Sequence, residues 1–223
     1  MQPDILANTH TRAIIGKKEA MQRLTGYMDQ LTLVYDQTFR GILGGLTPDE
    51  LRHAIYVPDH MQEIPENAQT YGEIIHYPEA IYQYVIGWFG WDVTKLLSVG
   101  PKDEAERLVK LMGGKKKVIS AANRALKEKE FALAAQLIQY VYLLEPTNKE
   151  VREMKAELLR QMAYRCTGSI PRAFLLAEAL TLEGKTGYPK LVPLCRLGIS
   201  NGLSAGYRSC NLVHSGGEYD LYA

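Results

Sequence analysis

The sequence predicts an all-α protein, a helical bundle that contains a tetratricopeptide-like helix pair. A short irregular N-terminal segment precedes this bundle, and a glycine-rich tail follows it. Apolar residues recur at positions i, i+3, i+4 and i+7 through most of residues 21–183, which is the period of a helix with one buried face. Glycine and proline separate these segments at the places where helices start and stop. Only residues 209–213 and 218–222 have a weak strand-like pattern.

The composition is that of an ordinary globular chain. Of its 223 residues, 46% are hydrophobic and 23% are charged, and the formal charge is +1. This charge gives no field that would attract nucleic acid or an anionic membrane, and no apolar run is long enough to span a bilayer. The N-terminus has no signal-peptide pattern and the three cysteines form no CxxC pair, so we expect a reducing, cytoplasmic location by default.

The first predicted helix begins near residue 21 and ends at a glycine cluster. Its apolar residues trace one broad face, which we expect to be buried. That face consists of Met21, Leu24, Met28, Leu31 and Tyr35, widened by Tyr27, Val34 and Phe39, and the helix should end at Gly41, Gly44 and Gly45. A short second helix is predicted from Thr47 as N-cap, with Pro48 in the first turn and Glu50 at the capping-box position, and Val57-Pro58 stops it.

An aromatic stretch over residues 71–92 holds both tryptophans and four tyrosines. Its second half has Ile81, Tyr84, Val85 and Trp88 at helical spacing, which predicts a helix at the centre of the core. Its first half, which includes His76, is either a site or a well-packed entry to that helix. The residue pattern leaves both interpretations open.

The clearest local pattern lies in residues 118–165. Small residues at Ala122 and Ala134 flank a turn near residues 127–130, and Pro146 follows twelve residues after Ala134, which is typical of a tetratricopeptide-like pair. A helix before it starts at Pro101 and closes at a glycine pair, and a third helix follows the pair. One such pair cannot bury its own face, so it is either a hairpin inside one bundle or the wall of a peptide-binding groove. We expect the lysine run at 115–117 to be a solvated loop.

The sequence contains none of the common self-contained catalytic motifs. It lacks a phosphate-binding loop, a GxGxxG pattern, HExxH, GxSxG and HxHxDH. Cys195, Cys210 and His214 have a spacing that matches no common zinc module, and His53 and His60 are expected at the surface.

Five blocks together resemble the C-terminal part of alkyl and aryl sulfatases of the metallo-β-lactamase superfamily. They are THTRAIIG, YDQTFRGILGGLT, YGEIIHYPEAIYQYVIGWF, AERLVKLMGG and EFALAAQLIQYVYLLEPTN, and they run from about residue 8 to about residue 180. In that family a helical dimerisation domain follows a zinc-binding αββα hydrolase domain and precedes a sterol-carrier-like domain. The resemblance implies that residues 1–20 are a remnant of the catalytic domain, 21–183 the dimerisation domain, and 184–223 an irregular tail or truncated sterol-carrier-like segment.

The resemblance also assigns residues. His10 matches the last zinc-ligand histidine of the family, but the HxHxDH motif is absent here, so the zinc site is incomplete and we expect no stably bound zinc. Tyr71, His76 and Tyr82 match the region near the mouth of the active site, where a phenol or imidazole can donate a hydrogen bond to a sulfate oxygen. The alternative is that both tyrosines are core residues and His76 is a satisfied buried histidine.

The resemblance therefore implies the dimerisation-domain portion of an alkyl sulfatase, a homodimer that is inactive alone. It implies binding of alkyl sulfate only where a catalytic domain is present. Two other functions remain open: a stand-alone helical interaction module without catalysis, and a lipid- or alkyl-chain-binding remnant that uses an apolar pocket of the bundle.

Overall fold

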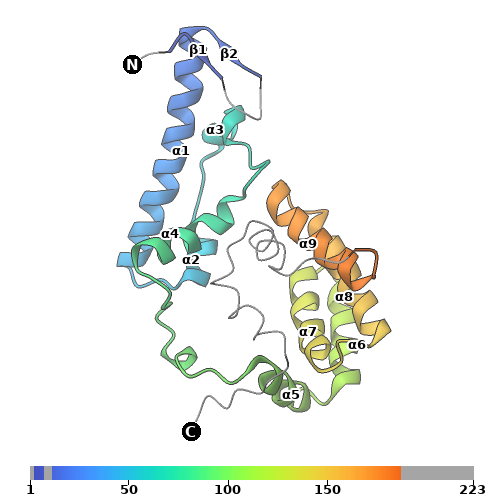
Figure 1. Ribbon diagram of the computed structural model, residues 1–223. Coiled ribbons are helices and arrows are strands. Elements are labelled where there is room, and N and C mark those ends of the chain that lie inside the picture. The colour runs from blue at the N-terminus through green and yellow to red at the C-terminus, as the bar shows by residue number, and fades with distance from the viewer. Residues whose placement is uncertain (1–2, 8–11, 187–223) are drawn as a thin grey trace, which may run out of the picture.

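The computed structural model describes residues 3–7 and 12–186, which are mainly helical, as predicted (Figure 1). The elements follow in the order β1 (Ile5–Leu6), β2 (Ile14–Ile15), α1 (Lys17–Leu43), α2 (Pro48–Ala54), α3 (Asp59–Gln62), η1 (Pro65–Asn67), η2 (Ile74–His76), α4 (Tyr77–Val85), η3 (Val93–Lys95), α5 (Pro101–Leu111), α6 (Lys115–Lys127), α7 (Phe131–Leu144), α8 (Lys149–Ala163) and α9 (Ser169–Leu182). None of the described helices is both long and apolar enough to cross a bilayer. The predicted weak hairpin of the tail lies outside the described residues.

The N-terminal segment was predicted to be irregular, but it contains two short strands. β1 and β2 pair antiparallel, with Ile5 opposite Ile15 and Leu6 opposite Ile14. The chain then turns into α1 at Gly16, whose φ of 114° lies in the region that favours glycine. The short apolar patch before Gly16 therefore forms one strand of a hairpin that contacts α1.

The buried face of α1 differs from the predicted one. Of the predicted face Val34 is buried, but its buried neighbours are small or polar residues on the side where η1 and α4 pack: Ala20, Gly26, Gln30 and Thr38. Their helical neighbours in the predicted apolar stripe are about half exposed: Tyr27, Met28, Leu31 and Tyr35. The capping box of α2 is as predicted, since the Thr47 side chain accepts from the Glu50 N–H and the Glu50 carboxylate accepts from the Thr47 N–H.

The aromatic helix was predicted wrongly in both length and burial. α4 ends at Val85, and Gly87 follows it with a φ of 112°, so the chain leaves the helix before the tryptophans. Tyr82 on α4 is 1% exposed, whereas Tyr84 is 88% and Trp88 is 83% exposed. Only the face of α4 that carries Tyr82 therefore belongs to the core.

The main hydrophobic core lies within α5–α8. Its buried side chains come from all four helices: Val109, Val118, Ala125, Phe131, Ala134, Ile138, Val141, Val151 and Leu158. Ala122 and Ala134 are fully buried, in agreement with the prediction that small residues let α6 and α7 approach closely. The lysine run was predicted to be a loop, but it forms the first turn of α6. Lys115 of this run forms an ion pair with Glu145.

The described helices fall into two groups. α1–α4 form one group and α5–α9 form the other, and among the described residues the extensive helix packing lies inside each group (Figure 1). Residues 86–100, here called the linking segment, join the groups as a largely exposed strip that contains only the single turn η3.

Candidate functional site at the junction of the two helical groups

The segment before α4 contains two of the predicted site residues, Tyr71 and His76, and it touches the second helical group. Its shape is set locally, because the Gln69 side chain accepts the Ile74 N–H at 2.7 Å. The His76 N–H donates to the Glu73 carbonyl at 3.0 Å, which forms the turn η2. Ile74 is buried beneath this turn and anchors it in the core of the first group.

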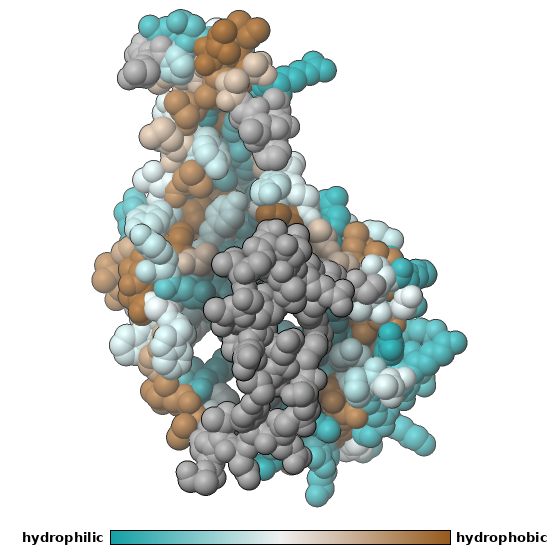
Figure 2. Space-filling view, in the orientation of Figure 1, coloured by the Kyte–Doolittle hydropathy of each residue, from teal (hydrophilic) through white to brown (hydrophobic). Residues whose placement is uncertain are grey.

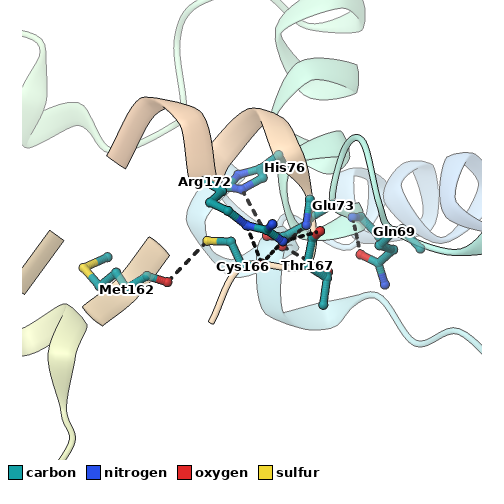
Figure 3. A network of polar contacts seen from close by, with 9 residues as sticks. Gln69, Glu73, His76, Met162, Cys166, Thr167 and Arg172 are labelled. Carbon is teal, nitrogen blue, oxygen red and sulfur yellow. Dashed lines mark hydrogen bonds and ion pairs between the residues drawn. The ribbon is translucent and has the colours of Figure 1, made fainter. Parts of the chain in front are cut away.

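Glu73 is the centre of a polar network that joins this segment to the start of α9 (Figure 3). Its Oε1 accepts from the Gly168 N–H at 2.8 Å and from the Thr167 hydroxyl at 3.1 Å. Its Oε2 lies 3.9 Å from His76 Nε2, an ion pair only when the imidazole is protonated. The carboxylate side chain is 15% exposed, so these hydrogen bonds form in partial shelter from water.

The structure separates the three predicted substrate-binding residues. Tyr71 is 62% exposed and His76 about half exposed, so both lie at the surface of the junction. Tyr82 is buried in the first group, and its hydroxyl donates to the Phe89 carbonyl at 3.1 Å. Burial raises the pKa of Tyr82, so its phenol stays neutral. Tyr82 thus resembles the core tyrosine of the alternative interpretation, whereas His76 is not a buried histidine.

The network offers hydrogen bonds but no activated nucleophile. The Cys166 thiol donates to the Met162 carbonyl at 3.5 Å, and burial raises the pKa of Cys166. A raised thiol pKa disfavours the reactive thiolate. The Arg172 guanidinium donates to the Cys166 carbonyl at 2.7 Å and the Thr167 carbonyl at 3.0 Å, so it stabilises the turn before α9.

A cavity of about 540 Å³ adjoins the network and is lined mainly by apolar side chains. Phe131, Leu133, Met162 and Leu175 line it together with Glu73 and Arg165, whose guanidinium lies 3.8 Å from the Phe131 ring centroid. The described part of the chain contains no group of three or more His, Cys, Asp or Glu residues that would hold a metal ion. The predicted zinc ligand, His10, lies outside the described residues.

Glu73, Thr167 and Gly168 are the residues that sequence reasoning missed. Glu73 lies 94 and 95 positions before Thr167 and Gly168, and no periodicity or spacing pairs a glutamate with a turn that far along the chain. The sequence signal was limited to the concentration of aromatic residues around Glu73.

Comparison with known proteins identifies the family. Residues 47–185, well over half of the chain, match the model of the family described as alkyl sulfatase dimerisation. The chain belongs to the alkyl sulfatase dimerisation family. The matched range includes both the linking segment and the whole α5–α9 group, whereas α1 lies before it.

Curated relatives of this alkyl sulfatase dimerisation domain extend the similarity to most of the chain. A linear primary-alkylsulfatase of Pseudomonas sp. (strain ATCC 19151) is 33% identical over 185 residues, which are 82% of this chain and 35% of the relative. An alkyl/aryl-sulfatase of Saccharomyces cerevisiae is 26% identical over 187 residues, 84% of this chain and 29% of the relative. The chain thus spans about a third of the length of these relatives.

A solved structure has the same fold. The stereoselective inverting sec-alkylsulfatase from Pseudomonas sp. superposes with a TM-score of 0.78 at 21% identity, over 84% of this chain and 30% of that chain. The family match and the sequence relatives make the chain a dimerisation-domain portion of an alkyl sulfatase, and the solved structure shows the shared fold.

Proposed function

We propose that this portion of an alkyl sulfatase binds a second copy of itself through the linking segment, and that it does not hydrolyse sulfate esters alone. The observation that carries the proposal is the exposure of large apolar side chains inside the residues that match the dimerisation family. Leu97 is 90%, Trp88 83% and Trp91 65% exposed, and Val93 and Leu96 are at least half exposed. Large exposed apolar patches on soluble proteins mark interaction sites, and these five side chains lie within ten residues of one exposed segment.

The position of the linking segment supports a second copy as its partner. Figure 2 shows hydrophobic residues at the lower left of the molecule, where Figure 1 draws the linking segment. In a two-fold dimer the linking segments of both copies lie in one interface, so each exposed apolar side chain is buried twice, once in each copy. Lys95 forms an ion pair with Asp92 on the same segment, so the positive and negative charges of these two side chains compensate each other.

The root of the linking segment is held in place, which orders the end of the proposed surface that carries the tryptophans. The Tyr82 hydroxyl binds the Phe89 carbonyl, and a Cβ at Gly90 would lie 3.2 Å from Pro48 Cδ, so the segment packs closely on α2. Asp92 accepts from the Thr94 N–H and hydroxyl and starts η3. A surface that is ordered before binding loses less conformational entropy on association.

For the whole sulfatase we infer the division of the chain stated above: 1–20 in the catalytic domain, 21–183 in the dimerisation domain and 184–223 in a following segment. We assign His10 to the zinc site of the catalytic domain, and we infer that α6 and α7 form the tetratricopeptide-like pair. Tyr71 and His76 would lie at the edge of the alkyl sulfate pocket, and Tyr82 would support that edge from beneath. Exposure of the first two side chains and burial of the third support this division of roles.

Two measurements test the proposal. Light scattering over a dilution series should give about twice the 25.1 kDa mass of the chain at high concentration and approach 25.1 kDa on dilution. The same protein with added zinc should not hydrolyse a medium-chain alkyl sulfate, because a catalytic zinc needs several ligands held in fixed geometry. A constant monomer mass would refute the dimer, and sustained turnover would refute the inactivity of the isolated chain.

A further inference from the structure

The N-terminus of α9 is capped by the other helical group rather than by its own sequence. Its N-cap residue is Gly168, which offers no side chain to accept the first free N–H groups of the helix. The Ser169 N–H donates to the Thr70 carbonyl at 2.9 Å, and the Ile170 N–H donates to the Tyr71 carbonyl at 3.1 Å. These bonds join parts of the chain about a hundred positions apart in sequence.

The Glu73 carboxylate completes this cap. It accepts from the Gly168 N–H at 2.8 Å and from the Thr167 hydroxyl at 3.1 Å, and it places a negative charge at the positive end of a 14-residue helix. The close approach also depends on Gly168, because a Cβ there would lie 2.9 Å from Glu73 Cγ. We call these contacts between residues 70–73 and 167–170 the latch.

Few other contacts fix the two groups relative to each other within the described residues. No helix of α1–α4 packs extensively on a helix of α5–α9. The covalent connection is the linking segment, whose residues 93–100 are all exposed, so no buried contact holds its second half. A thin interface and an exposed connection are the ordinary conditions for rotation of one group against the other.

We propose that Glu73 is a positioning residue: it closes the latch between the two helical groups, with the linking segment as their hinge. Closure sets the position of α9 against the segment that carries Tyr71 and His76. Opening frees the first amides of α9 and lets the groups separate. The consequence for Tyr71 and His76 rests on the proposed function, whereas the latch itself does not.

Hydrogen exchange of the full 223-residue chain tests the latch residue by residue. In Glu73→Ala we expect the amide of Gly168 to exchange about 10- to 100-fold faster, the change expected for loss of a hydrogen bond to a charged acceptor. Exchange should also rise at Ser169 and Ile170, while the amide of Ile138 in the α5–α8 core stays unchanged. Glu73→Gln should restore part of the protection, since the amide keeps an oxygen acceptor but loses the charge.

A double-mutant cycle separates a latch from a merely stabilising glutamate. Gly168→Ala should open the same contact from the other side by steric exclusion, so combining it with Glu73→Ala should add little further exchange. Glu153→Gln is the control, because Glu153 is an exposed carboxylate of α8 that, within the described residues, pairs with Lys149 on its own helix. This control should leave exchange at residues 168–170 unchanged.

Small-angle scattering gives the second readout. Glu73→Ala and Gly168→Ala should both increase the radius of gyration at a protein concentration where the oligomeric state is constant, and the control should not. Unchanged exchange at Gly168 in folded Glu73→Ala would overturn the proposal, as would a uniform rise of exchange through the α5–α8 core. A wild-type chain that stays monomeric but protects residues 168–170 would refute the proposed dimer and leave the latch standing.

Discussion

Replacing Leu97 by aspartate is the sharpest test of the proposed dimer surface. Leu97 is 90% exposed, so the substitution removes almost no packing inside one chain. Full burial of a leucine stabilises by about 1.5–3 kcal/mol, and a two-fold contact buries it in both copies, which gives about 3–6 kcal/mol per dimer. At about 1.4 kcal/mol per factor of ten, Leu97→Asp should weaken the dimer by roughly two to four orders of magnitude. The cost of drying the aspartate carboxylate adds to this loss.

Sedimentation velocity over a concentration series measures the dimer constant directly. Trp88 and Trp91 are the two tryptophans of the chain and both lie in the linking segment, so intrinsic fluorescence should shift to shorter wavelength as the wild type dimerises. Leu97→Asp should lose both signals. Leu43→Asp is the matched control, since Leu43 is 86% exposed but lies at the end of α1, outside the residues that match the dimerisation family. An unchanged dimer constant in Leu97→Asp, or an equal loss in the control, would refute the assignment of the surface.

Three further substitutions test how the first helical group is built. Tyr82→Phe removes the hydroxyl that holds the root of the linking segment and should lower the free energy of unfolding by about 1 kcal/mol, measured by urea titration. The Thr47 N–H and hydroxyl donate to the Glu50 carboxylate and hold the pKa of Glu50 below its ordinary value. The capping box therefore contributes stability that is fully present above the pKa of Glu50 in the unfolded chain. This contribution is lost as the pH falls through the lower pKa of Glu50 in the folded protein. The difference in melting temperature between the wild type and Glu50→Gln should therefore shrink in acid, and a constant difference would contradict this cause. Gly41→Ala should destabilise by about 1–3 kcal/mol, because the added Cβ lies 2.4 Å from Leu51 Cδ2 in the core; a stabilised variant would show that Leu51 can move.

Local signals predicted the elements that depend on neighbouring residues. Thr47, Pro48 and Glu50 specify a capping box within four positions, and that helix start is confirmed. Ala122 and Ala134 specify a close helix pair, because side chains without volume beyond Cβ allow two backbones to approach. In both cases the residues that form the structure lie inside one short window of the sequence.

Apolar periodicity predicted where a surface is hydrophobic but not what covers it. Met28 and Leu31 on α1 follow the helical period, yet both are about half exposed in the single chain. The same holds for Trp88, which the periodicity placed on a helix that Gly87 ends first. Burial within a chain and burial between chains require the same side chains, so the pattern cannot distinguish them.

The latch escaped prediction for a different reason. Glu73 is an ordinary acidic residue in a polar segment, and its function depends on an unfilled cap at Gly168, 95 positions away. A missing side-chain cap at a glycine is visible in the sequence, but the residue that replaces it is determined by tertiary structure alone. A glycine N-cap therefore does not reveal whether a helix has a tertiary cap, since α1, α5 and α6 also begin at a glycine without a side-chain cap.

The dimer surface and the latch are coupled if both proposals hold. A second copy that covers the linking segment restricts the segment about which the two helical groups would rotate. Restriction of the hinge lowers the entropy gained on opening, so dimerisation favours the closed latch, and by linkage the closed latch favours dimerisation to the same extent. The exposed apolar strip and Glu73 therefore act on one equilibrium, in which the assembled dimer holds Tyr71 and His76 in a fixed position.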